Sequence, residues 1–200
     1  MVYNMIYNTV YQLFERIFSF CVNLNFFFIN FLIKDKIAQF YFLELIAKVP
    51  YQTYLDIIKL TGRNKNNYNL HKKELENEVL HCLIAEELLG KKPLLVYYSS
   101  LVFCSGYYLL NFCMFLVFPK LAYLLMSIIE EHAYAKYIYF VDNNKDFLKN
   151  LNRQSPTTKK YITINKIENS IDSSLLQEVF LHIAQDELEH SQELRLLVFG

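Results

Sequence analysis

The feature that most constrains the fold is a Glu-x-x-His spacing that occurs twice, at Glu78/His81 and at Glu187/His190. Both pairs lie in long, largely apolar stretches without glycine or proline, a pattern that favours helix. Residues three positions apart in an α-helix lie one turn apart on the same face. Each pair therefore presents a carboxylate and an imidazole together, and the chain is expected to use these pairs on helices.

Two such pairs, with one inward glutamate from each of two further helices, form the ligand set of a di-iron carboxylate four-helix bundle. The natural single glutamates are Glu44, which follows an apolar aromatic run, and Glu130. The expected metal ligands are thus Glu44, Glu78, His81, Glu130, Glu187 and His190. The spacing alone is a weak signal, because Glu-x-x-His also arises by chance as a surface pair.

Composition limits the fold class and the partners. The chain has 200 residues, of which 54% are hydrophobic, which is enough for one domain with a sizeable core. Only four glycines and four prolines argue against an all-β fold with many turns. The net charge is zero and the basic residues form no strong stripe, which excludes nucleic acid as an expected partner. We expect one all-α domain over residues 1–200, a ferritin-like four-helix di-iron bundle with two additional membrane-associated apolar helices.

Those two apolar helices are expected at the N-terminus and in the middle of the chain. Residues 1–34 contain an uncharged run from 17 to 33, and residues 94–118 contain no charged residue at all. Both runs have a length that suits either a membrane span or a helix lying in one leaflet. The sequence leaves open which of the two applies.

The remaining helices are expected at residues 37–60, 70–89, 120–141 and 174–197, the last with Ser173 or Ser174 as its N-cap. A polar connection over 142–173 is expected to hold at most one short helix. Further acids on the third helix are assigned to a solvated or structural face rather than to the ligand set: Glu74, Glu76, Glu86 and Glu87. Glu86 or Glu87 is the exception that could support the site from one or two turns away. The other histidines are treated as ordinary surface or supporting residues: His71, His132 and His182.

Four ordered motifs carry a resemblance to a known family. They are the segments 43–51, 77–81 with 86–90, 130–134 with 137, and 186–190. Together they resemble the alternative oxidase superfamily, in particular its plastid terminal oxidase branch, over about residues 35–190. Val49-Pro50-Tyr51 and the Glu-Glu-Leu-x-Gly element at 86–90 look more like the plastid branch than the mitochondrial one.

The resemblance implies a membrane-bound di-iron quinol oxidase that couples oxidation of plastoquinol or ubiquinol to reduction of dioxygen to water. It implies that the six ligands above hold two iron ions. It also implies that Tyr137 is a redox-active tyrosine beside the metals, and that Asn77 and Asp186 orient the ligands through hydrogen bonds. Membrane lipid is then a partner, and a plastid membrane is favoured over the mitochondrial inner membrane.

Some positions depart from the family pattern. Gln39 stands where the family has an arginine near the quinol head group, and Leu45 stands where it has a threonine. Ala184-Gln185 replaces the usual Arg-Asp. The quinol pocket around Gln39 is therefore altered, which keeps a degenerate ferritin-like di-iron-binding membrane protein as an alternative. An integral membrane protein without metal is a third interpretation. The sequence leaves open which quinone is used and whether two chains form a homodimer.

Overall fold

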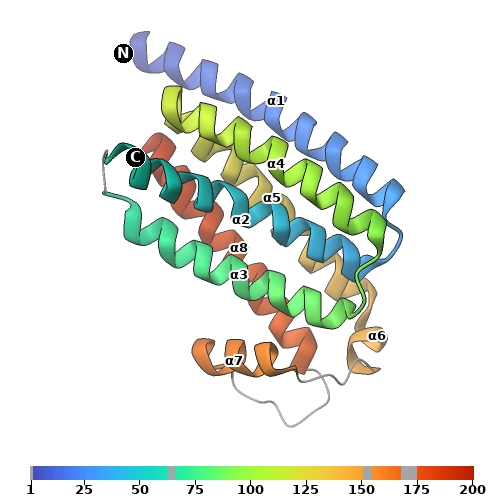
Figure 1. Ribbon diagram of the computed structural model, residues 1–200. Helices are drawn as coiled ribbons and strands as arrows, with labels where there is room; N and C mark the ends of the chain where they lie inside the picture. The colour runs from blue at the N-terminus through green and yellow to red at the C-terminus, as the bar shows by residue number, and fades with distance from the viewer. Residues whose placement is uncertain (1, 63–65, 151–154, 168–174) are drawn as a thin grey trace.

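The structure is a computed structural model that describes residues 2–62, 66–150, 155–167 and 175–200 (Figure 1). Within these ranges every regular element is a helix, so the expected all-α class is confirmed. The helices are α1 (Val2–Leu32), α2 (Lys36–Thr61), α3 (Tyr68–Leu89), α4 (Leu94–Val117), α5 (Pro119–Asn143), α6 (Lys145–Asn150), α7 (Pro156–Asn165) and α8 (Leu175–Phe199).

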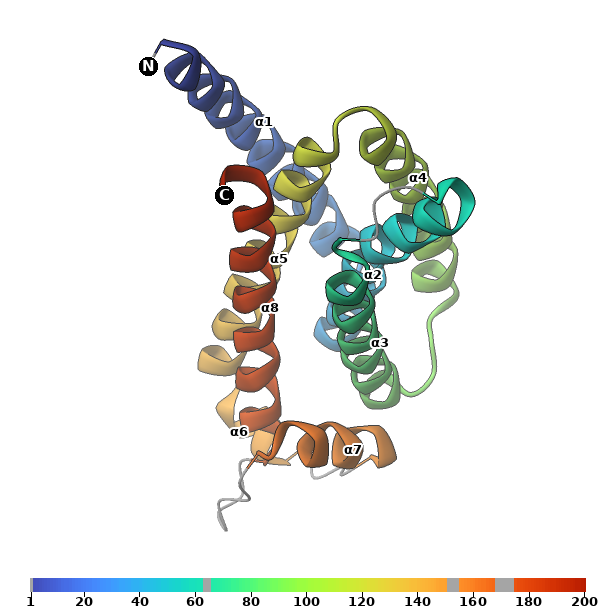
Figure 2. The ribbon, with the colours of Figure 1, turned by 90° about the vertical axis from the view of Figure 1, so that its left-hand side faces the viewer.

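Four helices form the central bundle. Helix α2 packs along α3, α5 packs along α8, and α2 also meets α5 (Figure 2). The two remaining long helices lie outside this bundle, with α1 against α5 and α4 against α2. Because each bundle helix carries part of the predicted ligand set, the four sets of side chains can meet between the two helix pairs.

Local sequence signals explain where the bundle helices begin and end. Asp35 caps α2, and its side chain accepts a hydrogen bond from the amide of Ala38 at 2.9 Å. Gly62 ends α2 in the left-handed region with φ of 65°, which glycine adopts at little cost. Gly90 ends α3 as expected, also with positive φ. Pro119 stands in the first turn of α5, where its missing amide hydrogen costs nothing.

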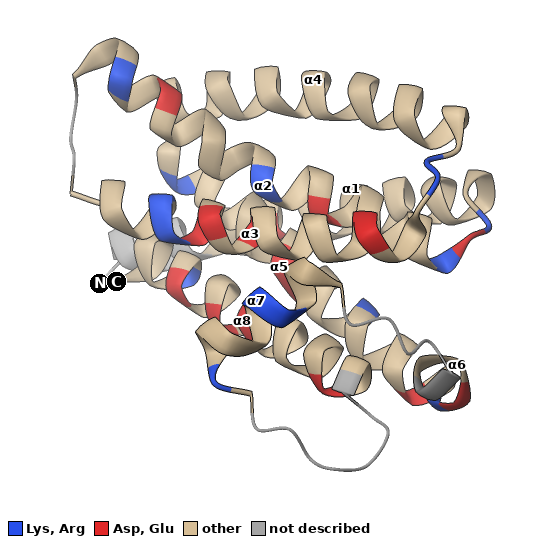
Figure 3. Cartoon of the chain, turned by 60° about the horizontal axis from the view of Figure 1, so that its bottom comes forward, with Lys and Arg blue, Asp and Glu red and all other residues tan. Residues whose placement is uncertain are grey.

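The outer helices keep much of their apolar surface exposed. Helix α4 carries no charged side chain, whereas charged residues occur on all four bundle helices (Figure 3). Among the described residues, α4 is the helix that is long and apolar enough to cross a membrane, and it is mostly unburied. Helix α1 buries Val22, Phe26 and Ile29 on one face and exposes Phe27 and Phe28 on another. Helix α1 therefore packs on the bundle with one face and leaves its opposite face exposed.

The connection before α8 contains more structure than expected. Helix α5 continues to Asn143, and two helices, α6 and α7, follow where at most one was predicted. Helix α7 begins at a Ser155 cap and packs on α3, where the Thr157 hydroxyl donates to Glu87 at 2.5 Å. The caps proposed for the last helix, Ser173 and Ser174, lie outside the described residues. Among the described residues of this segment, the polar composition thus includes two short helices, one of them with a serine cap.

Candidate metal centre

The six predicted ligands come together at the centre of the bundle. Their side chains are all buried, with exposed fractions from 0 to 4%. They fall into two groups of four whose ligand atoms lie within 4.8 Å of one another. The first group is Glu44, Glu78, His81 and Glu187, and the second is Glu78, Glu130, Glu187 and His190. Both groups contain Glu78 and Glu187, so these two carboxylates stand between the groups.

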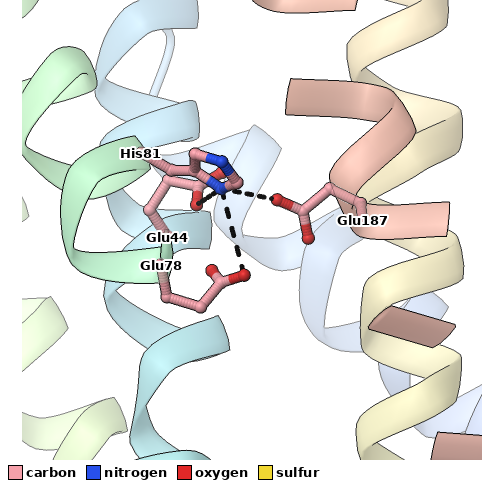
Figure 4. Close-up of side chains that lie close together, drawn as sticks. All are labelled: Glu44, Glu78, His81 and Glu187. Atoms are coloured by element: carbon pink, nitrogen blue, oxygen red, sulfur yellow. Dashed lines mark hydrogen bonds and ion pairs between the residues drawn. The ribbon is translucent and has the colours of Figure 1, made fainter. Parts of the chain in front are cut away.

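Figure 4 shows the first group, in which three helices aim their side chains at one point. The Nδ1 atom of His81 lies 3.0 Å from Glu187 Oε1, 3.7 Å from Glu44 Oε2 and 3.9 Å from Glu78 Oε1. In the second group, His190 Nδ1 lies 3.0 Å from Glu78 Oε1. The Nδ1 atom of each histidine therefore faces the carboxylates of the predicted ligand set, which is the arrangement of a metal ligand.

Four carboxylates in a closed interior create an electrostatic problem. Burial, followed by repulsion from Glu78, raises the pKa of Glu44 and that of Glu187 well above the ordinary value. The same two causes raise the pKa of Glu130 to about 7. Five carboxylate oxygens at the centre make no hydrogen bond: Glu44 Oε2, Glu78 Oε1, Glu78 Oε2, Glu130 Oε2 and Glu187 Oε2. Buried oxygens without partners are costly, and bound cations would offset that cost. The donor set thus fits two metal ions of the iron type.

The outward nitrogens of the two histidines are held by polar side chains. His81 Nε2 lies 3.1 Å from Asp186 Oδ2, and His190 Nε2 lies 3.4 Å from Asn77 Nδ2. Asn77 and Asp186 each directly precede a predicted ligand glutamate. Asn77 of α3 contacts the histidine of α8, and Asp186 of α8 contacts the histidine of α3. Contacts of this kind fix the ring orientation of metal-binding histidines, and here they involve the two residues predicted for that role, Asn77 and Asp186.

Two further supporting residues were not predicted. Glu74 is 3% exposed and contacts Nε2 of His190, although it was assigned to a solvated or structural face. Its position one turn before Glu78 could have indicated this, because both residues share a helix face. Tyr161 of α7 is buried and donates to Asp186 Oδ2 at 2.5 Å. No spacing in the sequence indicates Tyr161, since α7 reaches the bundle only through the tertiary fold.

Two tyrosines contact the single glutamates. The hydroxyl of Tyr137 donates to Glu44 Oε1 at 2.5 Å, so the structure brings this predicted residue to the centre. The hydroxyl of Tyr51 donates to Glu130 Oε1 at 2.9 Å, a contact that was not predicted. Burial, and then the charge of the neighbouring glutamate, raise the pKa of both phenols well above the ordinary value. Both tyrosines therefore keep their protons and act as donors.

Gln39 lies beside the centre rather than in it. Its amide donates to the Ile33 carbonyl at 2.6 Å, and the residue lines a cavity of about 320 Å³ between α1, α2 and α5. Phe40, on the wall of the same cavity, stacks on Tyr137 with ring centres 4.5 Å apart. The ring of Phe40 thus connects the wall of the Gln39 cavity with Tyr137, the predicted redox tyrosine.

A larger apolar cavity of about 510 Å³ lies between α1, α4 and the bundle. Its wall includes Ile46, two residues after Glu44, and Ile129, directly before Glu130. Gly106 of α4 also lines this cavity. Phe26 lines this cavity, and His132 lines the cavity of Gln39. The two rings stack with their centres 4.2 Å apart. One stacked pair therefore separates the two cavities. Periodicity alone could not predict either cavity.

Comparison with known proteins agrees with this geometry. A sequence model of the family described as alternative oxidase matches residues 21–197. The chain is similar to Ubiquinol oxidase 4, chloroplastic/chromoplastic, of Arabidopsis thaliana, with 28% identity over 177 residues. That match covers 79% of this chain and 50% of the relative, so the chain spans about half the length of the relative. No solved structure matches. Because the family match covers most of the chain and includes all six predicted ligands, the chain belongs to the alternative oxidase family.

Proposed function

We propose that the protein is a membrane-bound di-iron quinol oxidase, which passes electrons from a quinol to dioxygen and forms water. The observation that carries this proposal is the pair of four-ligand groups that share Glu78 and Glu187. Two quinols supply the four electrons and four protons that convert one dioxygen to two waters. Two iron ions, when bound, would supply the electron exchange with oxygen, which carboxylate and imidazole ligands support.

The side chains of this chain have separate parts in the proposed reaction. Glu44 and Glu130 would hold one ion each, while Glu78 and Glu187 would hold both. The Tyr137 hydroxyl donates to Glu44 at 2.5 Å and keeps its proton, so this side chain is placed to lend an electron and a proton during the reaction, which a quinol would then restore. The closed apolar surroundings exclude water and limit the escape of partly reduced oxygen.

The quinol is proposed to bind in the cavity of about 510 Å³. Its walls are almost entirely apolar, which suits the ring and tail of an isoprenoid quinol. The cavity lies against Ile46 and Ile129, close in sequence to two of the ligands. The neighbouring cavity at Gln39, on the other side of the Phe26–His132 pair, carries polar groups such as Asn30 and Lys36. A glutamine there can still form hydrogen bonds, but it lacks the charge of the arginine in the family pattern.

Membrane attachment is proposed through the exposed apolar faces of α1 and α4. Phe27, Phe28 and Phe31 are exposed on α1, and Leu101, Val102 and Leu109 are among the exposed residues on α4. Exposed apolar surface of this extent is typical of a lipid-facing region. A plastid membrane is the proposed location, since the similar Arabidopsis protein is described as chloroplastic. The proposal includes both plastoquinol and ubiquinol as substrates to be tested.

Quinol-dependent oxygen uptake tests the proposed function. Purified, iron-loaded protein should consume oxygen when given a short-chain plastoquinol or ubiquinol, and cyanide should not stop it. The His190→Ala variant should lose this uptake because it removes a ligand of the second group. Iron-loaded protein that consumes no oxygen with either quinol would refute the oxidase and support the alternative, a di-iron-binding protein without quinol oxidation.

A further inference from the structure

The two helices that carry the single glutamates repeat one pattern. On α2, Glu44 is followed by Tyr51, and on α5, Glu130 is followed by Tyr137 at the same spacing. This spacing is about two helical turns, so glutamate and tyrosine share one face of each helix. Each helix therefore presents a carboxylate and a phenol toward the centre of the bundle.

The pairing between these groups is crossed. Tyr51 of α2 donates to Glu130 of α5 at 2.9 Å, and Tyr137 of α5 donates to Glu44 of α2 at 2.5 Å. In both glutamates the Oε1 atom takes the hydrogen bond, whereas the Oε2 atom is buried and has none. One oxygen of each single glutamate is thus held by the opposite helix, and the other is left for a cation.

Both tyrosines are held by their surroundings. Tyr51 is completely buried, and its ring lies 5.7 Å from that of His71 and 6.1 Å from that of His190. The ring of Tyr137 packs between Phe40 and Phe180, at 4.5 and 5.4 Å. Neither phenol can swing away without disturbing this packing, so each hydrogen bond is set by the fold.

We propose that Tyr51 is a positioning residue of the metal centre, which keeps Glu130 bound to its ion through one oxygen only. Tyr137 does the same for Glu44, and we term the two crossed contacts the tyrosine brace. A carboxylate that binds an ion through both oxygens would have to share Oε1 between the ion and the phenol, which weakens both contacts, so binding through Oε2 alone is favoured. The brace therefore keeps one coordination position at each ion open. This inference rests on the proposed di-iron function and adds a residue to it.

The brace is tested by ⁵⁷Fe Mössbauer spectroscopy of the full-length, diferrous protein. Tyr51→Phe removes only the hydroxyl, so Glu130 becomes free to bind with both oxygens, and the quadrupole splitting of half of the ferrous absorption should change. Tyr137→Phe should change the other half, and the double variant should change all of it. The matched control is Tyr54→Phe on the same helix, because Tyr54 packs on His71 and pairs with Tyr123 rather than with a glutamate. The control spectrum should equal that of the wild type.

Two results would overturn the brace: a Tyr51→Phe spectrum identical to that of the wild type, or a double variant that changes only half of the absorption. If Tyr51→Phe does not fold, a fluorinated tyrosine at position 51 keeps the ring and strengthens the donor. It should shift the same half, and an unshifted spectrum refutes the proposal. Failure of the proposed function looks different, because that protein would bind no iron or consume no oxygen with quinol. Iron-loaded, active protein that is insensitive to Tyr51→Phe contradicts the brace alone.

Discussion

Glu78 and Glu187 differ from the other ligands because each belongs to both four-ligand groups. Replacement of Glu187 by alanine should therefore remove nearly all iron, whereas replacement of Glu44 should leave about half, since Glu44 belongs to one group. Metal analysis of the purified variants measures this difference. Glu189→Ala is the matched control, because Glu189 is exposed on the same helix and should keep full iron. Equal iron in the Glu187 and Glu44 variants would contradict the sharing.

The raised pKa of the buried carboxyls predicts how the metal-free protein responds to pH. Burial and repulsion from Glu78 raise the pKa of Glu130 to about 7, above about 4.3 in an unfolded chain. The folded chain binds more protons between these values, so stability is lost as pH rises through this window. The melting temperature of metal-free protein should fall from about pH 5 to about pH 7.5, and iron should abolish most of the fall.

The controls for this pH effect are two glutamine variants. Glu130→Gln should flatten the fall because it removes one of the titrating groups, whereas Glu76→Gln should not, since Glu76 is exposed. A metal-free protein whose melting temperature is constant or rises over this range would show that the carboxyls are not strained by burial.

At this scale the residues that gather at the centre were easier to predict from the sequence than the side chains that contact them. The Glu-x-x-His spacing is local, and helix geometry alone places both groups on one face. Tyr51 was missed as a contact because its partner, Glu130, lies on a different helix, and only the crossing of α2 and α5 brings them together. The repeat of glutamate and tyrosine on both helices was visible, but the crossed pairing was not. Glu74 was missed because an acid within a charged segment resembles a solvated one.

At the scale of elements, α4 forms one wall of the proposed quinol cavity. Gly106 lies on that wall, and a Cβ atom placed there would meet no atom within 4 Å. Gly106→Leu should therefore fill part of the cavity without disturbing the bundle. If the added side chain weakens quinol binding by about 1.4 kcal/mol or more, the Michaelis constant for quinol should rise about tenfold or more. The iron content should stay unchanged.

The neighbouring Ser105 provides the control for this change. Ser105 lines a different cavity, between α2, α3 and α4. Ser105→Leu should therefore leave quinol kinetics as they are, although it adds the same side chain to the same helix. If both variants behave alike, or if Gly106→Leu leaves the Michaelis constant unchanged, the quinol does not bind in this cavity.

The long helices were predictable because their apolar runs end at strong local signals. Asp35 and Gly62 bound α2, Gly90 ends α3 and Pro119 begins α5. Helices α6 and α7 were harder to predict, because they are short and polar. Tyr161 of α7 shows why this matters: it reaches Asp186 only because α7 packs on α3 in the tertiary fold.

At the scale of the whole molecule, α1 and α4 should attach the bundle to a lipid surface. Phe28 is 52% exposed on α1, and burying such a side chain in lipid contributes about 1.5–3 kcal/mol. Phe28→Asp should therefore reduce partitioning onto lipid vesicles by about tenfold or more in a flotation assay. The control is Ile164→Asp on α7, which is also exposed but belongs to neither outer helix. Equal loss in both variants would exclude a lipid-facing role for α1.

The general plan of the molecule was readable from the sequence because ligands, helices and apolar runs each leave a local pattern. The arrangement that makes the centre, with its shared carboxylates and crossed tyrosines, depends on how four helices pack and leaves no local pattern. Neighbouring cavities arise in the same way, because they are the spaces that packing leaves between α1, α4 and the bundle.

Iron analysis of purified full-length protein tests the central claim most directly, since every part of the account depends on a two-metal site. Protein reconstituted with ferrous iron and freed of excess metal should hold about two irons per chain. The Glu187→Ala variant, treated in the same way, should hold almost none because its carboxylate belongs to both four-ligand groups. A wild-type protein that retains no iron, or one that retains only as much as the variant, would contradict the account.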